Sequence, residues 1–264
     1  MAKTILITGA TDGIGRLTAQ KLAAQGHRLL LHGRNSTKLD AIAQQLTADG
    51  GNIETYVADL SRLADVRKLA TAIATQHSAL DVLINNAGVF NTPNPITADG
   101  LDVRFVVNAI APYLLTQRLL PLMDPTGRVV NIASAGQAPV DLQALRGDRR
   151  ISKDFDAYAQ SKLAIIMWSR HLAQSLGNVG PVIIAVNPGS LLGSKMVKEA
   201  FGMAGKDLNI GADILIRAAL SDEFATASGQ YFDNDSGQFA APHQDALDPQ
   251  QVEDVMEAIA TVIG

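Results

Sequence analysis

The feature that most constrains the fold of this chain is an alternation of short, mostly apolar runs with longer amphipathic ones, which continues almost to the end. Continuous apolar runs such as "TILIT" at 4–8 and "DVLIN" at 81–85 are typical of strands that helices cover on both faces, as in parallel sheets. Because crossovers between parallel strands are right-handed, the pattern predicts an α/β fold with a doubly wound, Rossmann-type parallel sheet of about seven strands and helices on both faces.

The runs also predict where the elements lie. We expect strands at 4–8, 28–32, 53–57, 81–85, 127–133 and 181–187, with a short seventh that begins at Gly229. We expect helices at 14–25, 36–48, 61–77, 99–123, 156–176 and 206–220. No linker, repeat or low-complexity segment divides the chain, so 1–264 is interpreted as one domain. The irregular segments 134–155 and 188–205 follow strand ends, where ligands bind in such sheets, and are expected to be the substrate loops.

Composition narrows the classes of function. The chain has 264 residues, of which 47% are hydrophobic and 18% charged, as a globular core requires. A net charge of −4 argues against a nucleic-acid or membrane partner, and the lack of cysteine excludes thiolate chemistry. We see no signal peptide and no apolar run of the roughly 18 residues that would suggest a membrane span, so we expect a cytoplasmic protein. The five histidines show no metal-ligand spacing, so no metal site is expected.

The first strand ends in a glycine-rich turn, "TGATDGIG", which places Gly9, Gly13 and Gly15 just before a helix. Glycines permit a tight turn and a close approach of backbone N–H groups to phosphate oxygens, and a helix N-terminus adds partial positive charge. The spacing differs from the G-x-G-x-x-G fingerprint, and the turn alone is compatible with a plain strand-to-helix connection. At the start of a doubly wound sheet it predicts nucleotide binding.

The ends of the next two strands suggest which nucleotide binds. An acidic residue at the second strand end would mark NAD, but Gly33 and Arg34 stand there. A guanidinium pairs with a 2′-phosphate, which favours NADP, although an ordinary exposed arginine is the alternative. Asp59 follows the third strand and is expected to accept a hydrogen bond from the adenine amino group. Alternatively it caps the helix at 61–77, a position for which Ser61 competes.

Tyr158 and Lys162 lie four residues apart in a mostly apolar helical stretch, "FDAYAQSKLAII". Side chains four apart share a helix face. A free phenol has a pKa of about 10, and an adjacent cation lowers it towards the range useful for proton transfer. The pair is either the polar rim of an amphipathic helix or a tuned acid.

Six motifs occur together in one order along the chain: Thr8-Gly9-(x)3-Gly13-Ile14-Gly15, Asn85-Asn86-Ala87-Gly88, Asn108, Ser134, Tyr158-(x)3-Lys162 and Pro188-Gly189. In this order and spacing they resemble the short-chain dehydrogenase/reductase family of classical type, over nearly the whole chain. The stretches around Asn108 and Tyr158 are most similar to retinol dehydrogenase-like members, which handle varied aldehydes, ketones and alcohols.

The resemblance implies a catalytic set of Asn108, Ser134, Tyr158 and Lys162. Tyr158 would exchange a proton with the substrate oxygen, which Ser134 also holds. Lys162 would lower the phenol's pKa and bind the nicotinamide ribose, and Asn108 would hold a water that links Lys162 to solvent. The resemblance also implies a cofactor site for NADP, formed by Gly9, Thr11, Asp12, Gly13, Ile14, Gly15, Arg34, Asn35, Asp59, Leu60, Asn86, Ala87, Gly88, Tyr158, Lys162, Pro188, Gly189 and Leu191.

One position departs from the family pattern. After Pro188-Gly189 the family often has a threonine that binds the nicotinamide carboxamide, whereas this chain has Gly193. Ser190, Ser194 or the backbone of Leu191 is expected to replace it.

The substrate and the assembly state can be predicted only in outline. Apolar residues in the two substrate loops indicate a lipophilic substrate; they are Ala138, Pro139, Val140, Leu191, Leu192 and Met196. The resemblance implies a homodimer or homotetramer in which the helices at 99–123 and 156–176 pack against their symmetry mates.

The sequence therefore predicts an NADP(H)-dependent oxidoreductase that interconverts a carbonyl compound and its alcohol. One alternative is a catalytically silent NADPH-sensing regulator, but relatives of that kind usually lose the tyrosine or the lysine. A lyase- or epimerase-type member would be expected to carry a longer C-terminal substrate domain than the roughly thirty residues after Asp233.

Overall fold

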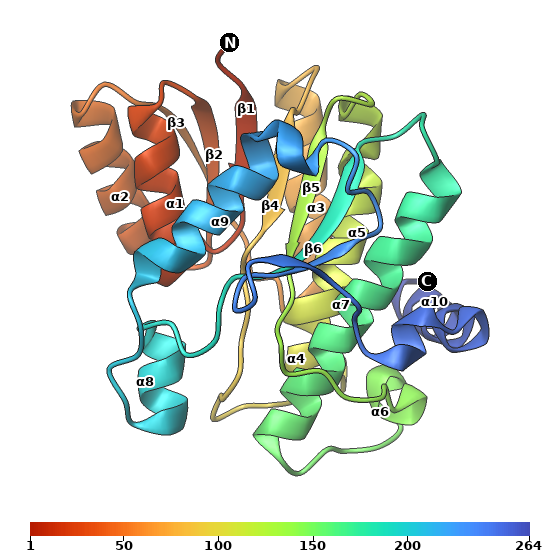
Figure 1. The fold of residues 1–264 in the computed structure, drawn as a ribbon. Coiled ribbons are helices and arrows are strands. Elements are labelled where there is room, and N and C mark those ends of the chain that lie inside the picture. The colour runs from red at the N-terminus through yellow and green to blue at the C-terminus, as the bar shows by residue number, and fades with distance from the viewer.

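The fold is built on one eight-stranded sheet with the order β3-β2-β1-β4-β5-β6-β7-β8 (Figure 1). We describe it from a computed structural model that covers residues 1–264, except for the side chain at position 201. The strands are β1 (Thr4–Ile7), β2 (Arg28–Gly33), β3 (Asn52–Val57), β4 (Val82–Asn85), β5 (Arg128–Ile132), β6 (Val182–Asn187), β7 (Tyr231–Asp233) and β8 (Gln238–Ala240). The first seven pair in parallel, whereas β8 runs antiparallel to β7. The prediction of about seven strands omitted β8, a three-residue strand at the sheet edge.

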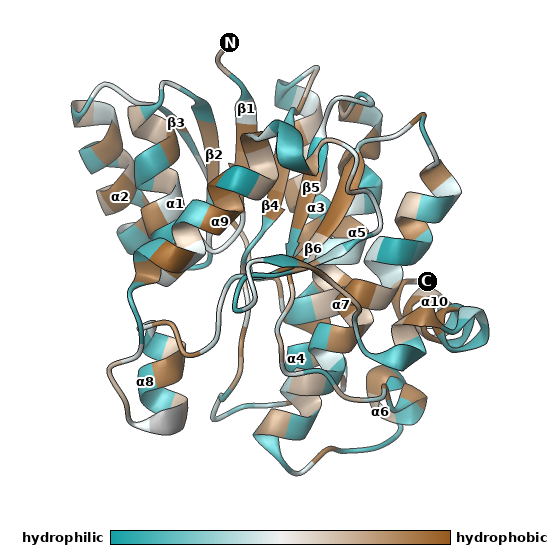
Figure 2. Ribbon diagram, viewed as in Figure 1, coloured by the Kyte–Doolittle hydropathy of each residue, from teal (hydrophilic) through white to brown (hydrophobic). Residues whose placement is uncertain are grey.

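Helices cover both faces of the sheet, as predicted. One face carries α1 (Gly13–Ala24), α2 (Ser36–Ala48) and α9 (Leu208–Leu220), and the other carries α3 (Leu63–Gln76), α5 (Ala111–Leu119) and α7 (Asp154–Leu176). Successive strand residues point to opposite faces, so Leu29 and Leu31 belong to one core while Leu30 belongs to the other. All three side chains are fully buried. The strands accordingly form a hydrophobic band through the molecule (Figure 2).

The predicted helix at 99–123 is composite. It consists of α4 (Val103–Phe105), a π-helical turn over Val106–Ile110, α5, and a 3-10 turn over Leu120–Leu122. Pro112 has no N–H to donate to the carbonyl of Asn108 four residues earlier, and the N–H of Ala111 reaches back five residues to Val106. The irregular turn therefore surrounds Asn108, which the sequence identified as a site residue.

The same composite helix, Val103–Leu122, is long and apolar enough to cross a membrane, contrary to the sequence expectation that no such run exists. It is 72% buried inside the protein, as a core helix of this fold would be. Its composition alone is therefore weak evidence for a membrane span.

Three helices were not predicted. They are α6 (Leu142–Arg146), α8 (Lys195–Phe201) and α10 (Pro249–Ile263). The first two lie within the segments 134–155 and 188–205, which were expected to be loops, and they are only five and seven residues long. Helix α10 packs against α6 and α7 and buries Val255 and Ile259. Asp248 caps it and Pro249 opens it, a start signal that was present in the sequence.

Candidate active site

The glycine turn after β1 packs directly against the segment after β4. Asn86 donates from Nδ2 to the carbonyl oxygens of Thr8 and Gly9, at 2.9 and 3.1 Å. A Cβ on Gly9 would lie 2.8 Å from the Cα of Ala87, and one on Gly15 would lie 2.3 Å from Asn86 Nδ2. Gly9 also has a φ of +67°, which favours glycine. Two predicted cofactor-binding motifs thus form one surface, and glycine is required for their contact.

Asp12 and Gly13 are placed together in a way that the sequence did not predict. Asp12 is the N-cap of α1, and its carboxylate accepts a hydrogen bond from the N–H of Gly13 at 2.7 Å. An N–H that was expected to face phosphate is therefore already bonded to a carboxylate.

The end of β2 lies beside the glycine turn. A Cβ on Gly33 would be 2.5 Å from Cγ2 of Thr11, so the next residue, Arg34, starts at the edge of the same surface, where it is exposed. Asn35, predicted as a cofactor contact, is the N-cap of α2, and its Oδ1 accepts from the N–H of Lys38 at 2.9 Å. Sequence reasoning missed this cap because Asn serves both purposes.

Asp59 lies at the end of β3, as predicted, but neither it nor Ser61 caps the following helix. Helix α3 begins at Leu63, and its N-cap position is Arg62, which makes no side-chain capping bond. Asp59 instead accepts from the N–H and the hydroxyl of Ser61, at 3.0 and 2.8 Å. Leu60 between them is buried in the core.

Ser134 and Tyr158 meet beyond the end of β5. Burial raises the pKa of the Tyr158 phenol, and a hydrogen bond from Ser134 lowers it in part. The Ser134 Oγ also accepts from the N–H of Gly136 at 3.1 Å. The structure thus brings together the two hydroxyls that were predicted to share one substrate oxygen.

Lys162 lies under Tyr158 on the same face of α7, as the spacing predicted. Its Nζ is 5.5 Å from the centre of the Tyr158 ring and donates to the carbonyl oxygen of Ile132 at 2.7 Å. The residue is only 3% exposed, and burial lowers its pKa to about 7. Two of its three ammonium hydrogens are therefore available to other acceptors, but burial disfavours the protonated form that carries them.

Asn108 is brought close to Lys162, because both flank the position where Gly88 would carry a Cβ. That point is 3.4 Å from Asn108 Oδ1 and 3.8 Å from Lys162 Nζ. The Asn108 amide donates to Val89 O and Ser161 Oγ, both at 2.9 Å, and accepts from the N–H of Val89 at 2.8 Å. The Asn108 side chain, which was expected to hold a water, is thus hydrogen-bonded to other groups of the protein.

In the segment after β6, Leu192 is not in the substrate wall where it was expected, and the backbone around Gly193 is tightly packed. Gly189 is in positive φ at +121°, after Pro188. A Cβ on Gly193 would lie 2.7 Å from the carbonyl oxygen of Ala204, so a threonine does not fit there. Leu192, expected in the substrate wall, is 3% exposed and belongs to the interior.

The two serines of this segment are both engaged. Ser190 donates from its N–H and its hydroxyl to Asp235, and Ser194 caps α8 through the N–H of Val197. Of the three expected replacements for the threonine, the backbone of Leu191 is left. Leu191 has a φ of +56°, which is unusual for a leucine, and its carbonyl oxygen accepts from the N–H of Lys206.

Residues that sequence reasoning missed hold Ser134 in place. Its carbonyl oxygen accepts from Tyr231 Oη at 3.2 Å and from Gln137 Nε2 at 3.0 Å. Gln137 in turn accepts from the N–H of His243 at 2.8 Å. The sequence carried no signal for this chain of contacts, because Tyr231 and His243 lie about a hundred residues beyond Ser134 and Gln137.

His32 is a second omission. This buried side chain of β2 accepts from the N–H of Gly9 at its Nδ1, 3.3 Å away, and lies 3.1 Å from the carbonyl oxygen of Ala58 at its Nε2. Burial lowers its pKa to about 4, so the ring is neutral near pH 7. It therefore joins the glycine turn to the end of β3.

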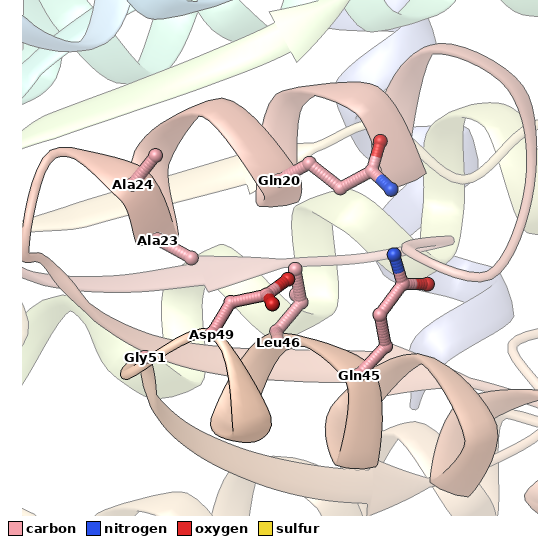
Figure 3. A pocket seen from close by; sticks show the side chains of 7 residues that line it. All are labelled: Gln20, Ala23, Ala24, Gln45, Leu46, Asp49 and Gly51. Carbon is pink, nitrogen blue, oxygen red and sulfur yellow. The ribbon is translucent and has the colours of Figure 1, made fainter.

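The hollows found elsewhere contain none of these residues. One, of about 170 Å³, lies between α1 and α2 and is lined by Gln20, Ala23, Ala24, Gln45, Leu46, Asp49 and Gly51 (Figure 3). Another, of about 400 Å³, lies near the ends of α6 and α10. Within the described residues, no group of three or more His, Asp or Glu side chains is placed to hold a metal ion.

Comparison with known proteins decides the family. The family model described as short chain dehydrogenase matches residues 3–205. The chain belongs to the short-chain dehydrogenase family. Human retinol dehydrogenase 13 is 31% identical over 260 residues, which covers 91% of this chain and 78% of that protein.

Two solved structures are also similar. A putative uncharacterized protein from Mycobacterium paratuberculosis has a TM-score of 0.82 at 28% identity, and the match covers 99% of this chain and 93% of that one. Landomycin C-6 ketoreductase LanV, with bound NADP and rabelomycin, has a TM-score of 0.69 at 30% identity, over 88% and 94% of the two chains. This short-chain dehydrogenase is thus an α/β oxidoreductase with retinol dehydrogenase-like relatives.

The site residues fit a nicotinamide cofactor. The glycines at 9 and 15 leave no room for a side chain where the turn meets Asn86 and Ala87, and Gly88 keeps the space beside Lys162 Nζ and Asn108 Oδ1 free of a Cβ. A buried ammonium with spare hydrogens suits a ribose hydroxyl.

Proposed function

We propose that this chain is an NADP(H)-dependent oxidoreductase that interconverts a lipophilic aldehyde or ketone and the corresponding alcohol. The observation that carries the proposal is the grouping of Ser134, Tyr158 and Lys162 at the carboxyl ends of the central strands, next to the glycine turn. Ligands bind at this edge of open α/β sheets.

The chain's own residues supply the proton chemistry. Ser134 and Tyr158 hydrogen-bond the substrate oxygen and polarise the carbonyl, and Tyr158 gives its proton to the oxygen as negative charge develops there. The reduced cofactor, when bound, supplies the hydride that the carbonyl carbon accepts. In the reverse direction Tyr158 takes the proton from the alcohol.

Lys162 supports this proton transfer in two ways. Its ammonium lies 5.5 Å from the Tyr158 ring centre and, when charged, stabilises the phenolate that is left after proton donation. Its remaining hydrogens are proposed to bind the ribose of the nicotinamide. Since burial lowers its pKa to about 7, Lys162 needs the hydrogen bond to Ile132 and those ribose oxygens to keep its charge.

Two observations support NADP over NAD. Arg34 is an exposed guanidinium directly after β2, where a carboxylate would select NAD. LanV was solved with bound NADP. We further propose that the N–H of Leu191 binds the carboxamide, because Ser190 and Ser194 are engaged elsewhere.

A lipophilic substrate is supported by an aromatic group beside the catalytic tyrosine. The ring of Phe90 lies 5.0 Å from that of Tyr158 and 6.4 Å from that of Phe155, measured between centroids. Phe155 is 53% exposed and Leu191 41%. Apolar surface of this kind next to a polar centre is typical of ligand sites.

The assembly state and the cellular location stay predictions. Helix α10 of the same chain packs against α7, so a homo-oligomer built on α7 would also have to accommodate α10. We propose a cytoplasmic protein with small-molecule substrates.

The direct test is the consumption of reduced cofactor by the purified protein over a panel of short, branched and aromatic aldehydes and ketones, with NADPH and NADH in parallel. We expect NADPH to be consumed with the lipophilic carbonyls. No turnover with any carbonyl, or an equal preference for NADH, would overturn the corresponding half of the proposal.

A further inference from the structure

Arg104 is one of the largest fully buried side chains among the described residues, with 1% of its surface exposed. A buried charge is costly unless it is paired and hydrogen-bonded. Its Nε and Nη2 donate to the two carboxylate oxygens of Asp102, at 2.8 and 2.7 Å, and its Nη1 donates to Asp154 at 2.5 Å. Burial by itself would lower the pKa of Arg104, but both carboxylates raise it and their effect prevails, so the guanidinium keeps its charge.

The two carboxylates belong to the two helical segments that carry Asn108, Tyr158 and Lys162, three of the four predicted catalytic residues. Asp102 is the N-cap of α4, and Asp154 is the first residue of α7. Arg104 precedes Asn108 by four residues, and Asp154 precedes Tyr158 by four. Because four residues make about one helical turn, the ion pair joins the two segments one turn before the catalytic residue of each.

A second link joins the same segments at the level of the site. Asn108 Nδ2 donates to Ser161 Oγ at 2.9 Å, and that hydroxyl donates to the carbonyl oxygen of Tyr158 at 2.7 Å. Helix α7 is thus held at Asp154 and at Ser161, about two turns apart, which restricts both sliding along its axis and rotation about it. The Arg104 side is rigid, since Asp102 also accepts from the backbone N–H of Arg104 at 2.9 Å.

We propose that Arg104 and Asp154 are positioning residues whose ion pair holds α7 in the register that brings Tyr158 and Lys162 to Ser134. The kinetic consequence rests on the proposed function, whereas the helix register is measurable without any substrate. The Asp154 side chain is 40% exposed, and ion pairs of such exposure contribute little to global stability. Catalysis is more sensitive, because a misplacement of about 1 Å costs about 100-fold in rate.

Asp154→Asn is the sharpest variant, because it removes one charge at constant size and leaves Arg104 paired with Asp102. Asp156→Asn is the matched control, since it removes the same charge from an exposed residue of the same first turn. We expect Asp154→Asn to lower the single-turnover rate about 10- to 100-fold at saturating NADPH and substrate. The Tm should stay near wild type, and Asp156→Asn should match wild type throughout.

Hydrogen–deuterium exchange of the backbone amides at 157–165, measured without cofactor, gives a readout that does not depend on turnover. These amides should exchange faster in Asp154→Asn than in the control, and Asp154→Glu, which keeps the charge, should restore much of the protection and of the rate.

Three results would overturn the positioning role: wild-type rate or wild-type exchange in Asp154→Asn, an equal loss in Asp156→Asn, or a loss that follows a large fall in Tm. If the wild-type protein reduces no carbonyl, the proposed function fails, and the exchange comparison still decides whether the ion pair sets the helix register.

Discussion

Lys162 donates its ammonium hydrogen to the carbonyl oxygen of Ile132 at 2.7 Å, at the last residue of β5. This bond ties the catalytic helix to the strand that also leads to Ser134. Because Ser134 follows the same strand, the bond limits how far the cation can move from the serine hydroxyl. The bond also holds the lysine in a buried position, where the charged form is disfavoured.

The first prediction concerns the pH dependence of stability. The pKa of Lys162 is lowered by burial from 10.5 to about 7, so between these values the unfolded chain holds a proton that the folded, cofactor-free chain has released. The unfolded state then binds more protons, and the free energy of unfolding should rise by about 2 kcal/mol from pH 7 to pH 9. Urea unfolding at the two pH values measures this.

In Lys162→Met the rise should disappear, whereas Lys153→Met, which changes an exposed lysine at the N-cap of α7, should retain it. A wild-type protein equally stable at both pH values would show that the buried ammonium is not destabilised.

A second prediction concerns Arg34. Its replacement by alanine would remove the proposed charged hydrogen bond to the 2′-phosphate and should weaken NADPH binding about 10- to 100-fold, while NADH binding changes little. Titration of intrinsic fluorescence with each cofactor gives both Kd values. Equal wild-type affinities for the two cofactors would contradict the assignment.

The third prediction is a shift in substrate size. A Cβ on Gly136 would lie 3.5 Å from Phe155 Cζ and 3.6 Å from Ser134 Oγ, which is ordinary contact distance. Gly136→Ala should therefore fold normally and narrow the space beside the serine. We expect kcat/KM for bulky aromatic aldehydes to fall about 10-fold or more, and that for short aldehydes to stay unchanged.

Ala135→Ser, which adds a single heavy atom at the exposed neighbouring position, is the control for this variant and should leave the substrate profile unchanged. A uniform fall for all substrates in Gly136→Ala would argue against a substrate wall at Phe155.

Acid sensitivity supplies the fourth prediction. Burial holds the pKa of His32 at about 4, against 6.5 in its ordinary state, so the unfolded chain binds a proton between these values while the folded chain does not. Stability is therefore lost as the pH falls, and this histidine should account for about 2 kcal/mol of loss between pH 7 and pH 5. Urea unfolding at the two pH values measures this. The His32→Leu protein should lose about 2 kcal/mol less of its free energy of unfolding than wild type does.

His171→Leu, which changes a partly exposed histidine of α7, should lose as much as wild type does. If His32→Leu loses as much unfolding free energy at low pH as wild type does, the assignment of His32 as a neutral, hydrogen-bonded side chain is wrong.

Much of the fold was predictable because helix and strand periods are properties of local sequence. The helix predicted at 36–48 coincides with α2, and β1 to β7 lie within about two residues of their expected positions. β8 and α8, of three and seven residues, were missed because each carries too little of a hydrophobic pattern to be recognised.

The sequence could predict the site residues that follow strand ends, but it could not predict the hydrogen bonds that hold them in place. Residues such as Ser134 and Asn86 stand where a doubly wound sheet binds ligands, so topology brings them together. Whether Asn35 or Asp12 turns to a ligand or to its own backbone is not written in local sequence, because capping and binding use the same side chains. His32 reads as an ordinary strand residue, and its partners become visible only when three strands are assembled.

The central claim is that Tyr158 transfers the proton while a reduced cofactor delivers a hydride. The most direct measurement is the pre-steady-state loss of NADPH absorbance with a lipophilic aldehyde, in wild type and in Tyr158→Phe. Removal of a general acid costs about 100- to 10,000-fold, so at saturating NADPH we expect the variant to oxidise the cofactor at least about 100-fold more slowly. A Tyr158→Phe protein that oxidises NADPH at the wild-type rate would contradict the mechanism.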